Sequence, residues 1–306
     1  MSSHDLPEWL PAWCLDQFGS PPADVLFHRR SMSAVFGLQL ADGTDIVIKA
    51  RAGDGRAASC VAAQQWLAEN GFPCACPRTP VSRVGPLAVH VEEFRAEGEV
   101  LPGDTPEVAV RCAEVLARLM AGLADLAVAP PLPNPRWVRW DHADSGLWPA
   151  IASLDAKDQE LVPGYLTDIA GRARRRLLSA GLPCVLGHAD FEAHNLRWLD
   201  DRIWVVHDWD SLAWQPEAAL VGAASTVFPK LGPARLAPIE STEAFLAAYQ
   251  DARGRWFTAA EQEVAWAAGL WPVAHDIRWE ALHGYTAVSG EAFPVQAAER
   301  LHRANA

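Results

Sequence analysis

Two short polar motifs, separated by a predicted β-hairpin, constrain the fold of this chain more than any other feature. The first motif is H-A-D-F-E-A-H-N at 188–195, and the second is H-D-W-D at 207–210. Between them, β-prone runs at 196–199 and 203–206 flank a polar turn signal. A tight hairpin would bring Asn195 and Asp208 close together in space. The alternative interpretation is a surface hairpin edged with polar side chains.

The residue types and spacing in these motifs meet the needs of phosphoryl transfer. One carboxylate must accept the proton of an acceptor hydroxyl, while an amide oxygen and a second carboxylate hold Mg²⁺ against the phosphates. Asp190 and Asn195 stand five residues apart, and Asp208 follows Asp190 by eighteen residues (208 − 190). Oxygen ligands about 4 Å apart can share Mg²⁺, and substrate phosphates complete its shell. The segment therefore predicts a kinase that uses ATP or GTP with Mg²⁺.

The same motifs resemble the signature of the aminoglycoside phosphotransferase family, which are small-molecule kinases with a protein-kinase-like fold. The family usually reads H-G-D-x-x-x-x-N and then I-D-W-[DE], so Ala189 stands in place of a glycine. The resemblance implies that Asp190 is the catalytic base and that His188 braces the catalytic loop. It also implies that Asn195 and Asp208 are the metal ligands. Asp210 matches a further acidic position, for which we expect a supporting role.

The order of predicted elements along the chain agrees with this resemblance. Helical periodicity at 6–19 precedes strands at 35–40, 46–49 and 88–94 and a helix at 57–69. After Pro102 the pattern becomes helical, from 104 and then across 158–180, 216–228, 241–252, 259–283 and 291–304. We therefore expect an α+β, protein-kinase-like, two-lobed fold. A small β-rich lobe, 1–95, would bind the nucleotide, and a larger mainly helical lobe, 96–306, would carry the catalytic and acceptor sites.

Lys49 is the candidate phosphate ligand of the first lobe. It ends the second arm of the first hairpin, where a kinase-like fold keeps the lysine that contacts the α- and β-phosphates. The family normally pairs this lysine with a Glu on the next helix. Here the expected place falls near Cys60, and no acid occurs at 57–67. We expect Gln64 to orient Lys49 through a neutral hydrogen bond, which lacks the roughly doubled strength of a charge-assisted one.

Three further positions complete the nucleotide half of the predicted site. The link 92–94 is expected to bind the nucleobase through its backbone, which makes Glu92 and Phe94 nucleotide-binding candidates. The turn at 30–33 lacks glycines, and its backbone N–H groups or the hydroxyls of Ser31 and Ser33 are candidates for phosphate contacts. After the metal motif the family commonly has P-x-x-D-L. Ala219 occupies the Asp place here, so we expect a supporting contact to be lost.

The acceptor is expected to be a hydroxyl-bearing small molecule, such as an aminoglycoside-like antibiotic or an amino alcohol. The helical region 259–283 combines acids with aromatic residues, namely Glu261, Glu263, Asp276 and Glu280 with Trp266, Trp271 and Trp279. Carboxylates and aromatic faces suit a polyhydroxylated amine through ion pairing and cation–π contact. The alternative is an amphipathic helix with buried tryptophans and solvated acids.

Composition excludes several other classes of protein. A net charge of −12 argues against a nucleic-acid or anionic-membrane partner and is compatible with a cationic substrate. The longest apolar run, 218–228, is too short to span a bilayer, and the first residues lack a secretory pattern, so we expect a cytoplasmic protein. The six cysteines form no C-x-x-C pair and are expected to be buried free thiols. The oligomeric state is left open.

Two other functions compete with the kinase interpretation. The missing helix Glu and the change at Ala219 would also suit a catalytically weak or inactive relative that binds nucleotide or ligand. A metal-dependent phosphohydrolase would instead use His188, His194, His207 and Asp208 as ligands, because histidine-rich sites favour transition metals over Mg²⁺. That interpretation leaves Asn195 and Lys49 without a role.

Overall fold

The structure is a computed structural model that describes residues 6–30, 33–53, 55–126, 132, 134–232, 235–285 and 292–306. The chain divides into two compact units. One contains the residues up to Glu97 together with 205–210, and the other contains 98–204 and 211–306. The segment 205–210, which carries Asp208 and Asp210, therefore belongs with the first unit. The division expected from the sequence, after residue 95, places this segment in the second lobe.

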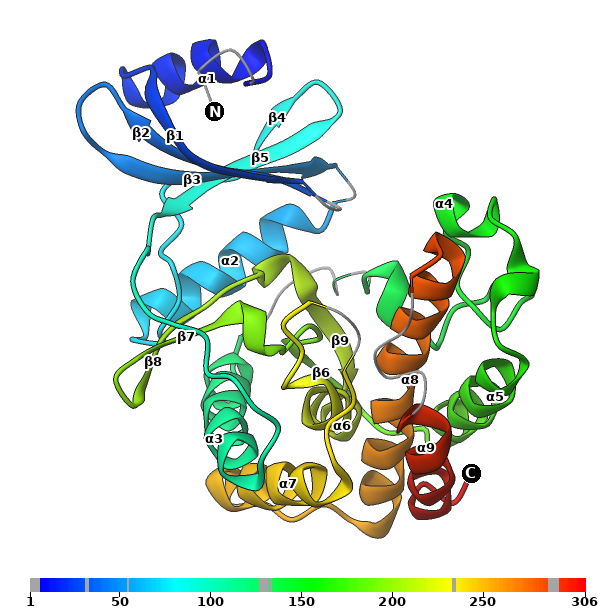
Figure 1. The fold of residues 1–306 in the computed structure, drawn as a ribbon. Coiled ribbons are helices and arrows are strands. Elements are labelled where there is room, and N and C mark those ends of the chain that lie inside the picture. Colours follow the sequence, from blue (N-terminus) through cyan, green and yellow to red (C-terminus); the bar gives the residue numbers. More distant parts are fainter. Residues whose placement is uncertain are drawn as a thin grey trace. The chain divides into compact units, whose positions relative to one another are not determined.

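The first unit is built on a five-stranded antiparallel sheet with the strand order β1-β2-β3-β5-β4 (Figure 1). Its strands are β1 (Pro22–Arg30), β2 (Ser33–Leu40), β3 (Asp45–Ala52), β4 (Ser82–Val84) and β5 (Leu87–Glu93). Two helices accompany the sheet, α1 (Trp9–Phe18) and α2 (Ala57–Glu69). In the β3–β5 register, Lys49 lies opposite His90 and Val47 lies opposite Glu92.

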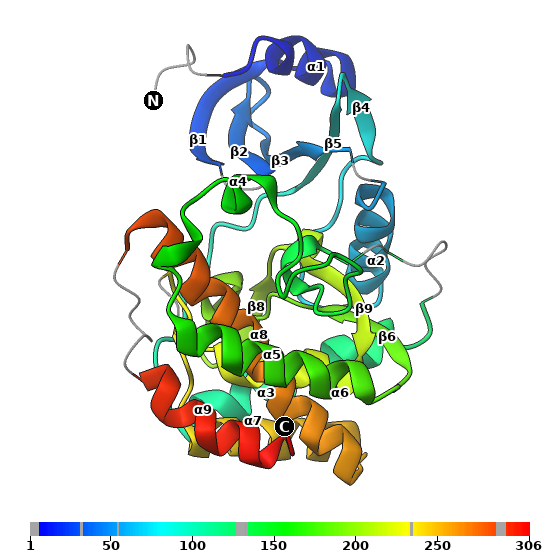
Figure 2. The ribbon, with the colours of Figure 1, turned by 90° about the vertical axis from the view of Figure 1, so that its right-hand side faces the viewer.

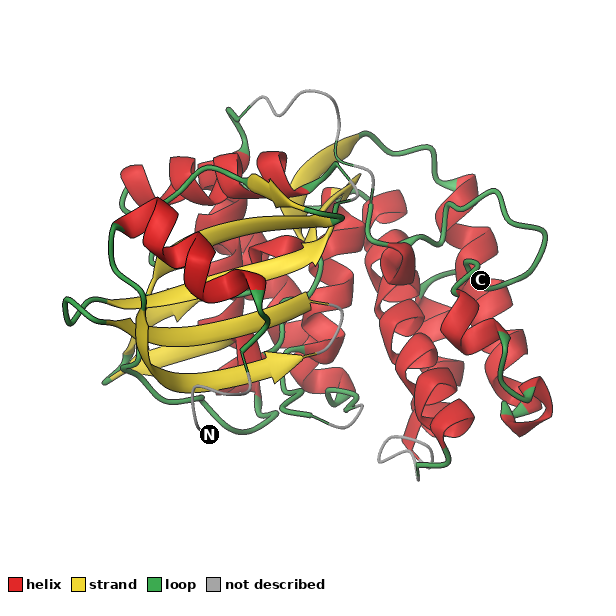
Figure 3. Ribbon diagram, turned by 90° about the horizontal axis from the view of Figure 1, so that it is seen from above, coloured by secondary structure: helices red, strands yellow, loops and turns green. Residues whose placement is uncertain are grey.

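The two faces of this sheet have different chemistry. Successive side chains of a strand point to opposite faces. Ile46, Ile48 and Ala50 of β3 join a buried apolar cluster that includes Leu10 and Cys14 of α1. Figure 3 shows α1 lying across the strands, and Figure 1 shows α2 on the other side of the sheet. The alternate residues Lys49 and Arg51 therefore point to the α2 face, where both are buried.

The second unit is mainly helical. Its α-helices are α3 (Pro106–Leu123), α4 (Ala152–Asp155), α5 (Gly164–Ser179), α6 (Glu217–Val227), α7 (Ile239–Arg253), α8 (Ala259–His283) and α9 (Ala292–Arg303). Helix α8 packs against both α6 and α5, and α3 packs against α7 (Figure 2). A side chain at Gly222 would overlap the backbone of Ala265, and one at Gly269 would overlap the Thr226 hydroxyl. These two glycines permit the close approach of α6 and α8.

Two small sheets flank the first motif, 188–195. Strands β6 (Cys184–His188) and β9 (Leu212–Pro216) pair antiparallel, with His188 opposite Leu212. Strands β7 (Leu196–Leu199) and β8 (Arg202–Val206) form the hairpin expected between the two motifs. Short 3₁₀ turns occur at Arg136–Val138, Gln159–Leu161, Ala193–Asn195 and Trp209–Ser211. The first motif thus begins at the last residue of β6 and leads into β7.

The expected α+β, kinase-like fold is confirmed, and most predicted elements are present. Helices at 57–69 and 259–283 have the predicted bounds. The helix predicted at 158–180 is instead a 3₁₀ turn followed by α5, because Pro163 disfavours helical backbone at the residue before it. Within the described ranges, no helix is both long and apolar enough to cross a membrane.

Candidate active site

The first motif, 188–195, forms a hydrogen-bonded loop in the second unit. The backbone N–H of Ala189 donates to the Ser211 carbonyl at 2.9 Å, and that of Asp190 donates to His188 Nδ1 at 3.2 Å. Asn195 Nδ2 donates to both the backbone oxygen and Oδ2 of Asp190, each at 2.9 Å. Because the amide nitrogen is used in this way, the Asn195 oxygen is the atom that remains to face a cation.

Lys230 supports the loop through a charged network that sequence reasoning missed. Its Nζ lies 3.0 Å from Glu192 Oε1 and 2.6 Å from Asp276 Oδ2, so it ties the loop to α8. Burial lowers the pKa of Lys230, but Glu192 and Asp276 outweigh this and hold the pKa above its ordinary value. Burial and the nearby Asp190 raise the pKa of Glu192, while Lys230 opposes that rise.

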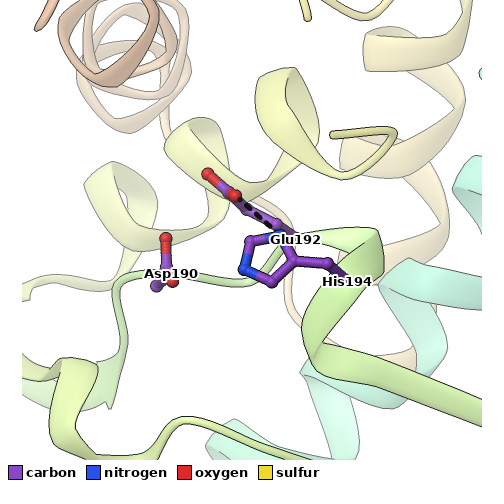
Figure 4. A group of neighbouring side chains, drawn as sticks. All are labelled: Asp190, Glu192 and His194. Atoms are coloured by element: carbon purple, nitrogen blue, oxygen red, sulfur yellow. Dashed lines mark ion pairs between the residues drawn. The ribbon is translucent and has the colours of Figure 1, made fainter. Parts of the chain in front are cut away.

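Figure 4 shows the three side chains of this loop that could together approach a metal ion. Ligand atoms of Asp190, Glu192 and His194 all lie within 4.8 Å of one another, and His194 Nδ1 is 3.3 Å from Glu192 Oε2. This is the one such group among the described residues, and it is not the histidine set of the phosphohydrolase interpretation. The Lys230 ammonium already lies beside Glu192, so a cation is present without a metal.

Lys49 of the first unit forms an ion pair with Glu92 of β5. Lys49 Nζ lies 3.2 Å from Glu92 Oε1, and both side chains are less than one-tenth exposed. Burial lowers the pKa of Lys49, but Glu92, Asp210 and Asp208 outweigh this and hold the pKa above its ordinary value. The lysine therefore carries its positive charge inside the unit.

Gln64 does not have the partner expected from the sequence. Its Nε2 donates to Glu92 Oε2 at 2.8 Å and to the Ala75 carbonyl at 2.7 Å. Its Oε1 is buried and has no hydrogen-bond partner among the described residues, so it accepts nothing from Lys49. The expected direct bond is wrong because the β3–β5 register places Glu92 diagonal to Lys49, within reach of a long side chain.

The second motif is held within the first unit by several contacts. Asp210 forms an ion pair with Arg51 of β3, and Arg56 donates to the Asp210 carbonyl at 3.1 Å. Trp209 Nε1 donates to the Val206 carbonyl at 3.0 Å, and the Trp209 side chain is buried. These contacts fix the short segment on both sides of Asp208.

Asp208 itself has left-handed backbone, with φ of 61°. Asp tolerates this region better than most residues, and such conformations cluster at functional sites. Asp208 belongs to the first unit and Asn195 to the second. Their joint coordination of one cation therefore stays a prediction.

The acids of α8 are used within the second unit. Glu261 forms a capping box with Thr258 and pairs with Arg255, Glu263 pairs with Arg176, and Asp276 pairs with Lys230. Glu280 is buried. The expectation that these carboxylates bind an amine is therefore not supported, because three of the four already pair with basic side chains of the second unit.

The tryptophans of α8 are buried, as the alternative of an amphipathic helix predicts, except for the one near the end of the helix. Trp266 and Trp271 are buried, whereas Trp279 is exposed. The Trp279 ring stacks on His283, with ring centroids 4.1 Å apart, and on Tyr285 at 5.8 Å. Trp279 is thus the one of the three that could face a ligand.

The remaining candidates have mixed outcomes. Phe94 contacts the Phe27 ring, with centroids 6.0 Å apart. Ser33 is half-buried in β2, and Ser31 lies outside the described residues. Ala219 and Ala189 line one small apolar cavity with Trp140 and Trp271. The place of the family's aspartate is therefore apolar here. The Ala189 N–H donates to the Ser211 carbonyl.

All six cysteines are free thiols, but they are not all buried. Cys184 is exposed at the start of β6, and Cys76 is half-buried. The sequence prediction of burial is wrong for these two and holds for the other four.

Solved structures resemble the whole chain. An amicoumacin kinase in complex with AMP-PNP and Ca²⁺ matches with a TM-score of 0.59 and 13% identity, covering 92% of this chain and 88% of that chain. An aminoglycoside phosphotransferase from Alicyclobacillus acidocaldarius matches with a TM-score of 0.56 and 15% identity over 99% and 97%. The fold is that of the aminoglycoside phosphotransferases and related small-molecule kinases.

A third similar structure is a spectinomycin phosphotransferase in complex with ADP and spectinomycin, with a TM-score of 0.57 and 11% identity over 97% of this chain and 93% of that chain. No family model and no curated protein matches the sequence. At these identities the likeness establishes the kinase-like fold, and the residues of the two motifs must carry the argument for function.

Proposed function

We propose that this protein is a small-molecule O-kinase that transfers the γ-phosphoryl group of ATP or GTP to a hydroxyl. The observation that carries the proposal is the geometry around Asp190. Asn195 Nδ2 donates to the backbone oxygen and to Oδ2 of Asp190, each at 2.9 Å. These bonds hold the Asp190 carboxylate and the Asn195 amide oxygen close together in one loop. In the first unit, Lys49 is held by its buried ion pair with Glu92, and its ammonium group is the proposed phosphate contact.

Asp190 acts as the base in this proposal. The acceptor oxygen forms a bond to the γ-phosphorus while the bond from that phosphorus to the β-phosphate oxygen breaks. The hydroxyl proton passes to the Asp190 carboxylate, and a nucleoside diphosphate leaves. Since little covalent chemistry is required of the protein, most of the rate gain comes from positioning and charge stabilisation.

The proposed metal ligands fit Mg²⁺. Asn195 and Asp208 offer oxygen atoms, which are the ligands that this hard cation prefers. The left-handed backbone of Asp208 is a conformation often kept for such a role. When bound, Mg²⁺ would neutralise phosphate charge, whereas Lys49 would hold the phosphates. We also propose that the first unit binds the nucleotide and that Glu92, Gln64 and Phe94 belong to the nucleotide-binding site.

The acceptor is proposed as a hydroxyl-bearing small molecule, such as an antibiotic or an amino alcohol. The amicoumacin and spectinomycin kinases of similar fold support this class. The net charge of −12 favours a cationic acceptor, although the paired acids of α8 do not add to that case. We place the reaction in the cytoplasm, because six free thiols are typical of a reducing compartment.

Titration calorimetry of Mg²⁺-ATP and Mg²⁺-GTP tests the nucleotide half. We expect binding by the wild type that is lost in Asp208→Ala. A phosphotransfer assay with a panel of antibiotics and amino alcohols tests the other half. There, Asp190→Asn should lower kcat by about 10²- to 10⁴-fold with nucleotide affinity unchanged.

The exposed Asp251 provides a matched control, since Asp251→Asn removes a carboxylate elsewhere in the same unit. If the wild type binds neither nucleotide, the proposal fails. If it binds nucleotide but phosphorylates nothing in the panel, the catalytically inactive relative becomes the better description.

A further inference from the structure

The partner of Lys49 comes from the neighbouring strand of the same sheet. β3 and β5 are adjacent and antiparallel, and Lys49 lies opposite His90. Glu92 stands two residues further along β5 on the same face, so its carboxylate reaches Lys49 Nζ at 3.2 Å. The ion pair is therefore formed by strand register inside one sheet.

Helix α2 supplies no acid to this lysine. Its one acidic residue, Glu69, is exposed at the last turn and accepts a hydrogen bond from Gln65 at 2.6 Å. Cys60 occupies the place expected for a glutamate and is buried near Arg51 and Arg56. The contact from α2 comes instead from Gln64, which reaches Glu92 and not Lys49.

Glu92 is held so that its carboxylate cannot turn. One oxygen faces Lys49 at 3.2 Å, and the other accepts from Gln64 at 2.8 Å. The side chain is 4% exposed, and a buried carboxylate is stable only when its oxygens are paired in this way. Lys49 and Gln64 thus each hold one oxygen of the Glu92 carboxylate.

We propose that Glu92 is the positioning residue for Lys49 and replaces the helix glutamate of kinase-like folds, so that sheet register and not the place of α2 orients the phosphate-binding lysine. This inference rests on the proposed function. Because β3 and β5 are joined by backbone hydrogen bonds, a displacement of α2 would remove the Gln64 contact but leave the ion pair. The orientation of the lysine would then not depend on the position of α2.

The first test compares Glu92→Gln with Gln64→Leu. Glu92→Gln keeps the shape of the side chain but removes its charge, and we expect kcat/KM for nucleotide to fall about 10- to 100-fold. Gln64→Leu removes one contact of Glu92 but leaves the ion pair, and it should lower kcat/KM by a smaller factor than Glu92→Gln does. Glu92→Asp retains the charge and should recover part of the loss.

A pH profile separates positioning from a purely structural effect. The charged groups that act on Lys49 are the carboxylates Glu92, Asp208 and Asp210, and Lys49 in turn acts on His90 of β5. Without the Glu92 charge, Lys49 loses its proton more readily. The alkaline limb of kcat/KM should therefore move to lower pH in Glu92→Gln.

Glu217→Gln is the matched control, because Glu217 is a mostly buried carboxylate paired with Arg253 and Arg255 in the second unit. It should lower stability without moving the pH profile. If Glu92→Gln keeps the wild-type kcat/KM and pH profile, this inference fails while the proposed function stands. If Glu92→Gln fails to fold, Glu92→Asp decides: the shorter side chain keeps the charge but moves it away from Lys49 Nζ, so wild-type kcat/KM in this variant would overturn the positioning role. A wild type that binds no nucleotide overturns the proposed function and this inference together.

Discussion

Arg51 of β3 forms an ion pair with Asp210, and this pair fixes the segment 205–210 within the first unit. The Arg51 and Asp210 side chains are 9% and 17% exposed, so water screens their attraction little. Arg56 adds a hydrogen bond to the Asp210 carbonyl at 3.1 Å. The acidic position for which the family resemblance implied a supporting role therefore holds the backbone beside Asp208.

Arg51→Met should loosen this segment. Removing one partner of a buried pair leaves an uncompensated charge, so we expect the free energy of unfolding to fall by about 3 kcal/mol. Hydrogen exchange at 205–210 should accelerate relative to the strands of the sheet, and Mg²⁺-nucleotide binding should weaken. Chemical denaturation and exchange mass spectrometry measure both effects.

Two variants control this prediction. Arg83→Met removes an exposed arginine of β4 and should change neither stability nor exchange. Arg51→Met/Asp210→Leu replaces the whole pair with apolar groups and should recover part of the lost stability. Unchanged exchange at 205–210 in the single variant would show that Trp209 and Arg56 hold the segment without the ion pair.

Lys230→Met should lower turnover without weakening nucleotide binding. The substitution leaves Glu192 and Asp276 without the ammonium that joins them, so the loop that carries Asp190 loses its tie to α8. A small misplacement of a catalytic group can lower kcat greatly, and we expect a loss of about tenfold or more. Steady-state kinetics with calorimetric nucleotide affinities separates the two effects.

Arg176→Met is the control for Lys230→Met, because it breaks another ion pair of α8, with Glu263 at 2.6 Å. A similar fall in stability without a fall in kcat is expected. Equal kinetic losses in both variants would mean that α8 as a whole, and not the contact with Glu192, supports the loop.

The sequence predicted those parts of the site that depend on local order. The hairpin at 196–206 and the spacing of Asp190 and Asn195 are local features, and the helix at 259–283 has a clear capping box at Thr258. Pairings between distant residues could not be predicted in this way. Lys230 lies 38 residues from Glu192 and 46 from Asp276, and no local pattern links them.

The nucleotide half shows the same limit. Lys49 and Glu92 were each identified as candidates, but their ion pair depends on β5 lying next to β3. Strand order within a sheet is a tertiary property, and a register shift of one residue would turn Glu92 to the other face. The short strand β4 and the pair β6–β9 were missed because their stability also comes from distant partners.

Thiol chemistry offers a test of burial that is independent of activity. Cys184 is the exposed thiol among six free cysteines, and burial raises the pKa of Cys14, Cys60, Cys74 and Cys112 to about 11 or 12. Since the thiolate is the reactive form, the native protein should show one fast reaction with an aromatic disulfide reagent. Cys184→Ser should abolish that fast phase, whereas Cys112→Ser should leave it unchanged.

Histidine burial predicts an acid-sensitive fold. Burial, with Arg278 and Lys230 nearby, lowers the pKa of His275 to about 4, and burial beside Lys49 lowers the pKa of His90 to about 4. An unfolded histidine binds its proton near pH 6.5. Between these values the unfolded chain binds more protons than the native protein, so the free energy of unfolding decreases as pH falls from 6.5 to 4.

His275→Phe should remove about half of this histidine contribution. A shift of this size corresponds to roughly 3 kcal/mol for each buried histidine, so the variant should lose less stability than the wild type over the same pH interval. Phenylalanine also keeps an aromatic ring beside Trp148, whose centroid lies 6.4 Å from that of His275. Denaturation curves at several pH values measure the slope, and His302→Gln, at an exposed position of α9, should leave it unchanged. Equal slopes for His275→Phe and the wild type would mean that His275 accepts its proton in the native protein without loss of packing.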